Sequence, residues 1–123
     1  MRDLSKIAQQ IREFRDARNW AQFHNPKDMA IAISIESSEL LEHFLWKTPK
    51  EVEARTVSHR EQIADEVADI SIYLVELADI LGIDLLAAME AKIAKNSAKY
   101  PADQVRGSAK KYTDYGQKKE TAE

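Results

Sequence analysis

The sequence of 123 residues contains no cysteine. Disulfide bonds, a thiol nucleophile and a zinc–thiolate site are therefore excluded. The chain also has no apolar run long enough to span a membrane, and residues 1–4 do not begin the hydrophobic segment of a signal peptide. A net charge of −3 supplies no basic field for broad nucleic-acid binding. We therefore expect a cytoplasmic protein that binds neither membranes nor nucleic acid.

Glycine and proline are also scarce, with three residues of each, and no alternating β-branched run reaches the length of a strand. This composition is typical of an all-α protein. We predict a four-helix fold with a short connecting helix. The four helices are expected over about residues 4–18, 26–46, 59–81 and 85–99.

Turn-forming residues mark the expected helix ends. Pro26 is predicted in the first turn of the second helix, and Gly82 is predicted to cap the third. Thr48 and Pro49 are expected to end the second helix, before a polar connection over residues 50–58. Residues 1–113 are predicted to form a single domain, and residues 114–123 a polar tail.

The second predicted helix carries apolar residues on nearly all sides. Met29 and Ile33 lie on one arc, Ile35 lies beside them, and Leu41 lies on the far side, with Glu36 among these apolar positions. A small helical monomer cannot cover such a helix completely. We therefore predict a homodimer or a homotetramer.

Two acidic pairs lie on the second and third predicted helices, Glu36 with Glu39 and Glu66 with Asp69. Residues three apart project to the same side of a helix, so antiparallel packing would bring the four carboxylates together. Such a cluster resists ionisation unless a cation or basic side chains neutralise it. Carboxylate oxygens suit Mg²⁺, with Mn²⁺ as a possible substitute. The residues alone leave open a metal site and a structural network of ion pairs.

Other polar and aromatic positions also have two interpretations. Lys92 and Asn96 share one helix face, which is typical either of a solvated surface or of contacts with phosphate. Aromatic residues at the two ends of the second helix favour either a hydrophobic core or the wall of a ring-binding pocket. These residues are Trp20, Phe23, His24 and Trp46. On the third helix, Tyr73 is expected beside the acidic pair, whereas Asp65 and Glu76 are expected to face solvent.

A di-iron site is the competing metal centre in a helical bundle. Such sites pair glutamates with a Glu-x-x-His motif. None of His24, His43 and His59 has a glutamate three residues before it, so the sequence argues against iron.

Several motifs follow one another in order along the chain. They are residues 19–26 (NWAQFHNP), Glu36-x-x-Glu39, residues 44–47 (FLWK), Glu66-x-x-Asp69-x-x-x-Tyr73, Lys92-x-x-x-Asn96-x-x-x-Tyr100-Pro101 and residues 106–113 (RGSAKKYT). Together they resemble the MazG-like all-α nucleoside triphosphate pyrophosphohydrolases, in the branch that contains dCTP pyrophosphatase.

The resemblance implies a nucleotide-pool house-cleaning enzyme that uses Mg²⁺ to cleave between the α- and β-phosphates of a nucleotide such as dCTP or a modified dCTP. By this resemblance, the acidic pairs hold the metal, and Glu36 or Glu39 also orients or deprotonates the attacking water. Lys92 and Asn96 bind the phosphates. Trp20, His24, Trp46 and Tyr73 bound the nucleoside. Ile11 stands where some relatives carry a polar contact to the base, which weakens the expectation of a cytosine preference.

Two other functions remain open at this stage. One is a non-catalytic helical module that binds nucleotides or partner helices through its apolar surface. The other is hydrolysis of dUTP or of another nucleoside triphosphate by the same fold.

Overall fold

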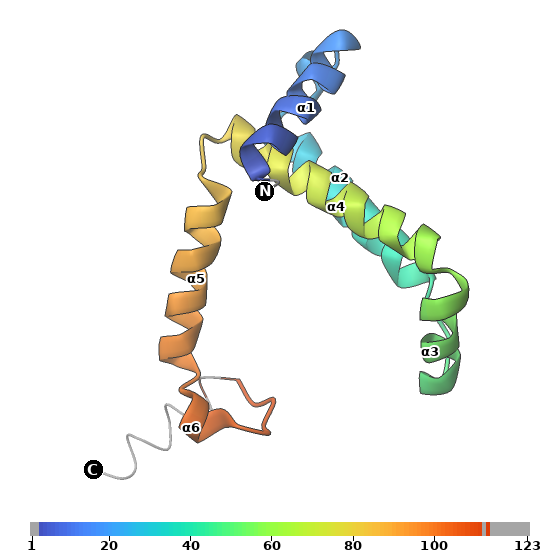
Figure 1. Ribbon diagram of the computed structural model, residues 1–123, viewed down its shortest axis with the longest axis vertical. Coiled ribbons are helices and arrows are strands. Elements are labelled where there is room, and N and C mark those ends of the chain that lie inside the picture. Colours follow the sequence, from blue (N-terminus) through green and yellow to red (C-terminus); the bar gives the residue numbers. More distant parts are fainter. Residues whose placement is uncertain (1–2, 112, 114–123) are drawn as a thin grey trace. The chain divides into compact units, whose positions relative to one another are not determined.

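The computed structural model describes residues 3–111 and residue 113, and this part of the chain contains helices and no strand. The helices are α1 (Leu4–Ala17), the 3₁₀ helix η1 (Ala21–Phe23), α2 (Pro26–Glu42), α3 (Pro49–Ser58), α4 (Arg60–Ile80), α5 (Leu85–Lys99) and α6 (Ala102–Val105) (Figure 1). The prediction of an all-α fold is confirmed. The chain divides into two compact units, one that ends at Asp84 and one that begins at Leu85. The predicted tail over residues 114–123 lies outside the described residues, and the single domain over residues 1–113 stays a prediction.

The two predicted turn residues act as expected. Asn25 caps α2 by accepting a hydrogen bond from the Asp28 backbone N–H at 2.9 Å, and Pro26 is the first helical residue. After α4, Gly82 has a φ of +66°. The backbone N–H of Ile83 donates to the Ala78 carbonyl at 2.8 Å, which completes a Schellman motif.

Helix α3 is the predicted short connecting helix, and it occupies all of the polar connection expected over residues 50–58. Thr48 is its N-cap, and the Thr48 side chain accepts from the Glu51 backbone N–H while the Glu51 side chain accepts from the Thr48 N–H. With Pro49 in the first turn, this capping box starts a helix of 10 residues. Helix α2 correspondingly ends at Glu42, earlier than the predicted Trp46.

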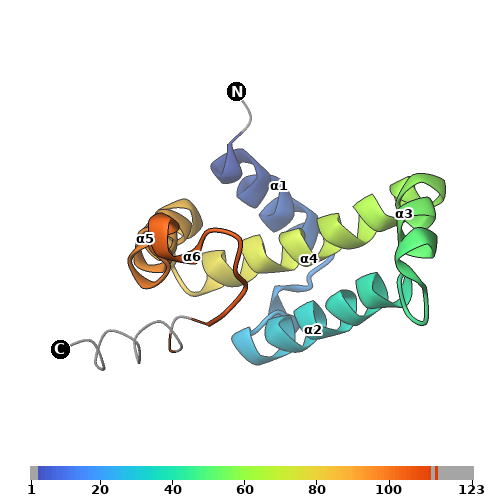
Figure 2. The ribbon, with the colours of Figure 1, turned by 90° about the horizontal axis from the view of Figure 1, so that it is seen from below.

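Helices α2 and α4 pack antiparallel along each other, and α3 lies at the end where the chain turns from one to the other (Figures 1 and 2). Helix α1 packs on α4. The buried apolar side chains are Met29 from α2 and Val75 and Ala78 from α4. The core of the first unit therefore lies on the α2–α4 pair, the same two helices that carry the acidic residues.

Much of the apolar surface of α2 remains exposed in the single chain. Ile31, Ile35 and Leu41 keep 47%, 54% and 60% of their surface. None of the helices in the described ranges is long and apolar enough to cross a membrane. The predicted homodimer or homotetramer, and the cytoplasmic location, stay predictions.

Candidate metal and nucleotide site

Antiparallel packing of α2 and α4 brings three of the four predicted acids together. Glu36 and Glu39 from α2 and Glu66 from α4 each offer a carboxylate oxygen, and these three oxygens lie within 4.8 Å of one another. Asp69, one turn beyond Glu66, does not belong to this group. Its negative charge nevertheless acts on Glu36 and Glu66.

Mutual repulsion and loss of solvent perturb the ionisation of these acids. Burial, a hydrogen bond with Glu39 and the charges of Glu39, Asp69 and Glu66 raise the pKa of Glu36 to about 7. Burial and the charge of Glu39 also raise the pKa of Glu66. The protonated forms are therefore favoured when no cation is bound.

Two buried oxygens test whether this cluster fits a metal ion. The Oε2 atoms of Glu36 and Glu66 are buried and have no hydrogen-bond partner. Buried polar atoms are rarely left unsatisfied. Close carboxylate oxygens without donors are the ligand set of a hard divalent cation such as Mg²⁺. The cluster therefore fits a metal ion.

A cavity of about 520 Å³ begins beside the acidic cluster, between α1 and α4. Its wall on α1 is mainly apolar, with Ile11 and Phe14, and its wall on α4 runs from Asp69 to Glu76. The complete lining is Ile7, Gln10, Ile11, Phe14, Arg15, Trp20, Asp69, Ile72, Tyr73 and Glu76. Asp69 joins the cavity to the acidic cluster.

Trp20 reaches this cavity because of how α1 ends. Asn19 takes a φ of +54°, which asparagine tolerates, and the Trp20 N–H donates to the Arg15 carbonyl at 3.1 Å. This Schellman motif turns the Trp20 ring onto Phe14, with ring centroids 5.8 Å apart and an edge-on arrangement. Trp20 and Tyr73, two of the residues expected to bound the nucleoside, line the same cavity, and that role stays a prediction.

Tyr73 lies between the acids and the cavity. Burial and the charges of Glu36 and Asp69 raise the pKa of its hydroxyl. The phenol therefore stays protonated at neutral pH and can donate a hydrogen bond.

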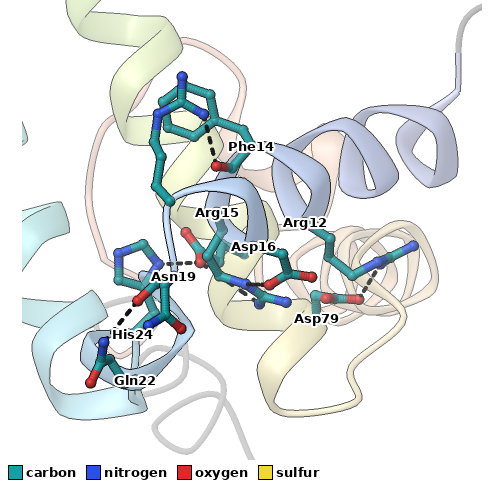
Figure 3. Close-up of polar contacts among 10 residues, drawn as sticks. Arg12, Phe14, Arg15, Asp16, Asn19, Gln22, His24 and Asp79 are labelled. Atoms are coloured by element: carbon teal, nitrogen blue, oxygen red, sulfur yellow. Dashed lines mark hydrogen bonds and ion pairs between the residues drawn. The ribbon is translucent and has the colours of Figure 1, made fainter.

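The expectation that Glu76 faces solvent is wrong. Glu76 is 4% exposed and lines the cavity, and its Oε1 lies 2.5 Å from His24 Nδ1 and 3.9 Å from Arg15 Nη1. The helical period already indicates this position, because Glu76 follows Tyr73 by three residues and Asp69 by seven. Arg15 also contacts Asp16 at 2.9 Å, and Arg12 pairs with Asp79 at 2.8 Å, as Figure 3 shows. His24 therefore lies behind the cavity wall, where it holds Glu76, rather than among the lining residues.

The remaining predicted site residues are not among the residues that line the cavity. Trp46 is 92% exposed and has a φ of +60° in the turn after α2. Lys92 and Asn96 are exposed residues of α5, which belongs to the second unit. Their roles in substrate binding stay predictions.

The described structure is therefore that of an all-α protein in which carboxylates from two antiparallel helices gather beside a partly aromatic cavity, an arrangement that fits a metal ion. The chain belongs to the MazG-like family, whose model matches residues 31–115. The family resemblance predicted from the ordered motifs is confirmed.

Curated relatives match most of the chain. It is 42% identical over 113 residues to dCTP pyrophosphatase 1 of Bos taurus, a match that spans 90% of this chain and 67% of the relative. For dCTP pyrophosphatase 1 of Homo sapiens, the identity is 40% over 90% of this chain and 66% of the relative. The chain thus spans about two thirds of the length of these relatives. Among solved structures, a pyrophosphatase from Archaeoglobus fulgidus aligns with a TM-score of 0.78 and 37% identity, over 82% of this chain and 94% of that chain.

Proposed function

We propose that the protein is a Mg²⁺-dependent nucleoside triphosphate pyrophosphohydrolase. It converts a pyrimidine deoxynucleotide such as dCTP, or a modified dCTP, into the monophosphate and pyrophosphate, which removes unwanted nucleotides from the pool. The observation that carries the proposal is the acidic cluster, which adjoins a partly aromatic cavity through Asp69. The similarity to dCTP pyrophosphatases supports the same reaction.

Glu36, Glu39, Glu66 and Asp69 hold the metal ion, for which Mn²⁺ is a possible substitute. When bound, the ion neutralises phosphate charge and lowers the pKa of coordinated water. Glu36 or Glu39 orients the attacking water or accepts its proton. The water oxygen forms a new bond to the α-phosphorus while the bond from that phosphorus to the α–β bridging oxygen breaks. The electron pair of the broken bond leaves with pyrophosphate.

The cavity between α1 and α4 receives the nucleoside. Trp20 and Tyr73 supply the ring contacts, Ile11 gives the cavity an apolar floor, and His24 fixes Glu76 in the wall. Lys92 and Asn96 are proposed to contact phosphate oxygens, and Trp46 to contact the nucleoside. A homodimer or homotetramer is supported by the exposed apolar residues of α2.

Pyrophosphate release tests the proposal. The purified protein with Mg²⁺ is offered all natural deoxynucleoside triphosphates and modified dCTPs, with dUTP in the same panel. Glu39→Gln and Asp69→Asn are expected to lower turnover by at least about a hundredfold, because each removes charge that holds the metal and its water. Glu42→Gln and Asp65→Asn are the matched controls, since both acids are exposed on the same two helices outside the cluster.

Equal turnover by Glu39→Gln, Asp69→Asn and the controls would show that the site is misassigned. A folded protein that releases pyrophosphate from no nucleotide would instead be a non-catalytic binding module.

A further inference from the structure

A second group of charged and ionisable side chains lies at the far end of the α2–α4 pair. It consists of His43 after α2, Arg55 in α3 and His59 between α3 and α4, and we call it the cationic cluster. Arg55 Nη2 lies 3.3 Å from His43 Nδ1. The rings of His43 and His59 have centroids 6.4 Å apart. Three separate segments of the chain thus bring these side chains together.

Arg55 lacks the partners that a half-buried guanidinium normally has. Its Nε atom is buried without a hydrogen-bond partner. Within the described ranges, none of the ion pairs includes Arg55. An arginine side chain has five donors and no acceptor, so this group can be satisfied only by an acceptor such as an anion.

The contact between Arg55 and His43 also fixes which ring nitrogen of His43 carries hydrogen. Because the guanidinium only donates, His43 must accept at Nδ1. Its Nε2 therefore carries the hydrogen and is a second donor in the cluster. The Nδ1 of His59 lies 2.7 Å from the Ser58 hydroxyl.

Electrostatics at His59 agree with an unneutralised positive region. Burial and the positive charges of Arg55 and Lys47 lower the pKa of His59. A bound anion would offset the effect of these positive charges on the pKa of His59.

The register of the two helices places the cationic cluster next to the acidic cluster. On α2, His43 follows Glu39 by four residues and Glu36 by seven, so all three share one face. On the other side, His59 precedes Glu66 by seven residues, which corresponds to about 10 Å of helix. The cavity begins at Asp69 and extends in the opposite direction. Cavity, acids and cationic cluster therefore follow one another along α4.

We propose that the cationic cluster binds the β- and γ-phosphates of the substrate, and hence the pyrophosphate that leaves. This inference rests on the proposed function, because the order of the three sites matches the order of nucleoside, scissile phosphate and leaving group. Arg55 donates two charge-assisted hydrogen bonds to the terminal phosphates, and the Nε2–H of His43 donates a third.

Binding of inorganic pyrophosphate, measured by calorimetry in Mg²⁺ without turnover, tests the inference. Arg55→Gln should weaken pyrophosphate binding by roughly tenfold to a hundredfold, the range expected for lost hydrogen bonds between charged groups. Binding of dCMP should change by less than about twofold, since it contacts only the cavity and the metal. Arg60→Gln is the matched control, because it removes the same charge from an exposed arginine next to His59.

A purely structural role for Arg55 would lower the thermal midpoint and leave both dissociation constants unchanged, and this result would overturn the inference. An equal loss in Arg60→Gln would also overturn it, because it would reflect general charge. If Arg55→Gln does not fold, pyrophosphate binding is measured with His43→Gln instead, and NMR is measured on the unmodified protein. The imidazole NMR signals of His43 and His59 should shift as pyrophosphate is added, and static signals would refute the subsite.

Failure of the proposed function gives a different result. If the protein binds pyrophosphate through Arg55 but releases no pyrophosphate from any nucleotide, the phosphate subsite stands and the proposed reaction is refuted. If Arg55→Gln instead hydrolyses dCTP with the kcat and KM of the unmodified protein, and binds pyrophosphate with the same affinity, the proposed reaction stands and the phosphate subsite is refuted.

Discussion

Removing one negative charge from the acidic cluster should stabilise the metal-free protein. In Glu36→Gln the amide has nearly the shape of the carboxylate but no charge. Two unit charges 4.8 Å apart repel by about 0.9 kcal/mol in bulk water and by about 3.5 kcal/mol at an effective dielectric constant of about 20. Glu36 is half-buried and its neighbour Glu39 is exposed, so solvent screens part of this repulsion. We therefore expect Glu36→Gln to raise the free energy of unfolding by about 1–2 kcal/mol.

The gain should depend on pH in a defined direction. The pKa of Glu36 in the folded protein is about 7, above its ordinary value of 4.5, so the folded state binds this proton more tightly than the unfolded state. The unmodified protein therefore loses stability as the pH rises from about 4.5 to about 7, and Glu36→Gln lacks this loss.

Thermal unfolding with a chelator, at pH 5 and pH 8, measures the effect. At pH 8, the midpoint of Glu36→Gln should lie about 4–8 °C above that of the unmodified protein, and at pH 5 the difference should shrink to a small fraction of this. Glu53→Gln, an exposed acid of α3, should stay within about 0.5 kcal/mol at both pH values. An unchanged midpoint at pH 8, or the same gain at both pH values, would refute the account of repulsion in the cluster.

Substitutions at three further positions test the fold around the site. Glu76→Gln should lower the free energy of unfolding in urea by about 1–3 kcal/mol, because it removes a buried charge from between His24 and Arg15; an unchanged value would mean that these contacts do not stabilise the protein. Gly82→Ala should cost about 1 kcal/mol in the same assay through its positive φ alone, because no atom lies within 4 Å of the added methyl group. Gly82→Asn should cost less, and equal losses would contradict a backbone origin. Thr48→Ala should cost about 1 kcal/mol by opening the capping box of α3, whereas Thr48→Ser should retain most of the stability; a similar loss in both variants would argue against the cap.

The helices could be predicted where both ends carry clear signals. Helix α5 runs from Leu85 to Lys99 as predicted, because Gly82 ends α4 before it and Tyr100-Pro101 follows it. Helix α3 was predicted only as a short connecting helix, without its start or its length, because Thr48-Pro49 is compatible with two structures. Proline is common just after a helix and also in the first turn of a new helix. Glu51, three residues after Thr48, completes a capping box and so indicates the start of a new helix.

The acidic pairs were predictable because two carboxylates three residues apart share a helix face whatever the tertiary structure. The structure brings Glu36, Glu39 and Glu66 together, whereas their role as metal ligands stays a prediction. The cavity could not be predicted in the same way. Its walls come from α1 and α4, which are distant in sequence, and only their packing determines that Ile11 faces Tyr73 across one cavity.

The two tryptophans of the chain sit in contrasting surroundings, and this makes them separate optical reporters. Trp46 is 92% exposed, so its emission should resemble that of indole in water and should be quenched readily by iodide. Trp20 lies beside Phe14 and His24 at the cavity, so its emission should respond to a nucleotide that stacks there. The left-handed backbone at Trp46 costs about 1–2 kcal/mol of folding free energy. Because the Trp46 side chain is so exposed, packing within the first unit does not offset this cost. A shift of its emission to shorter wavelength with rising protein concentration would therefore report a second copy covering the ring, independently of substrate.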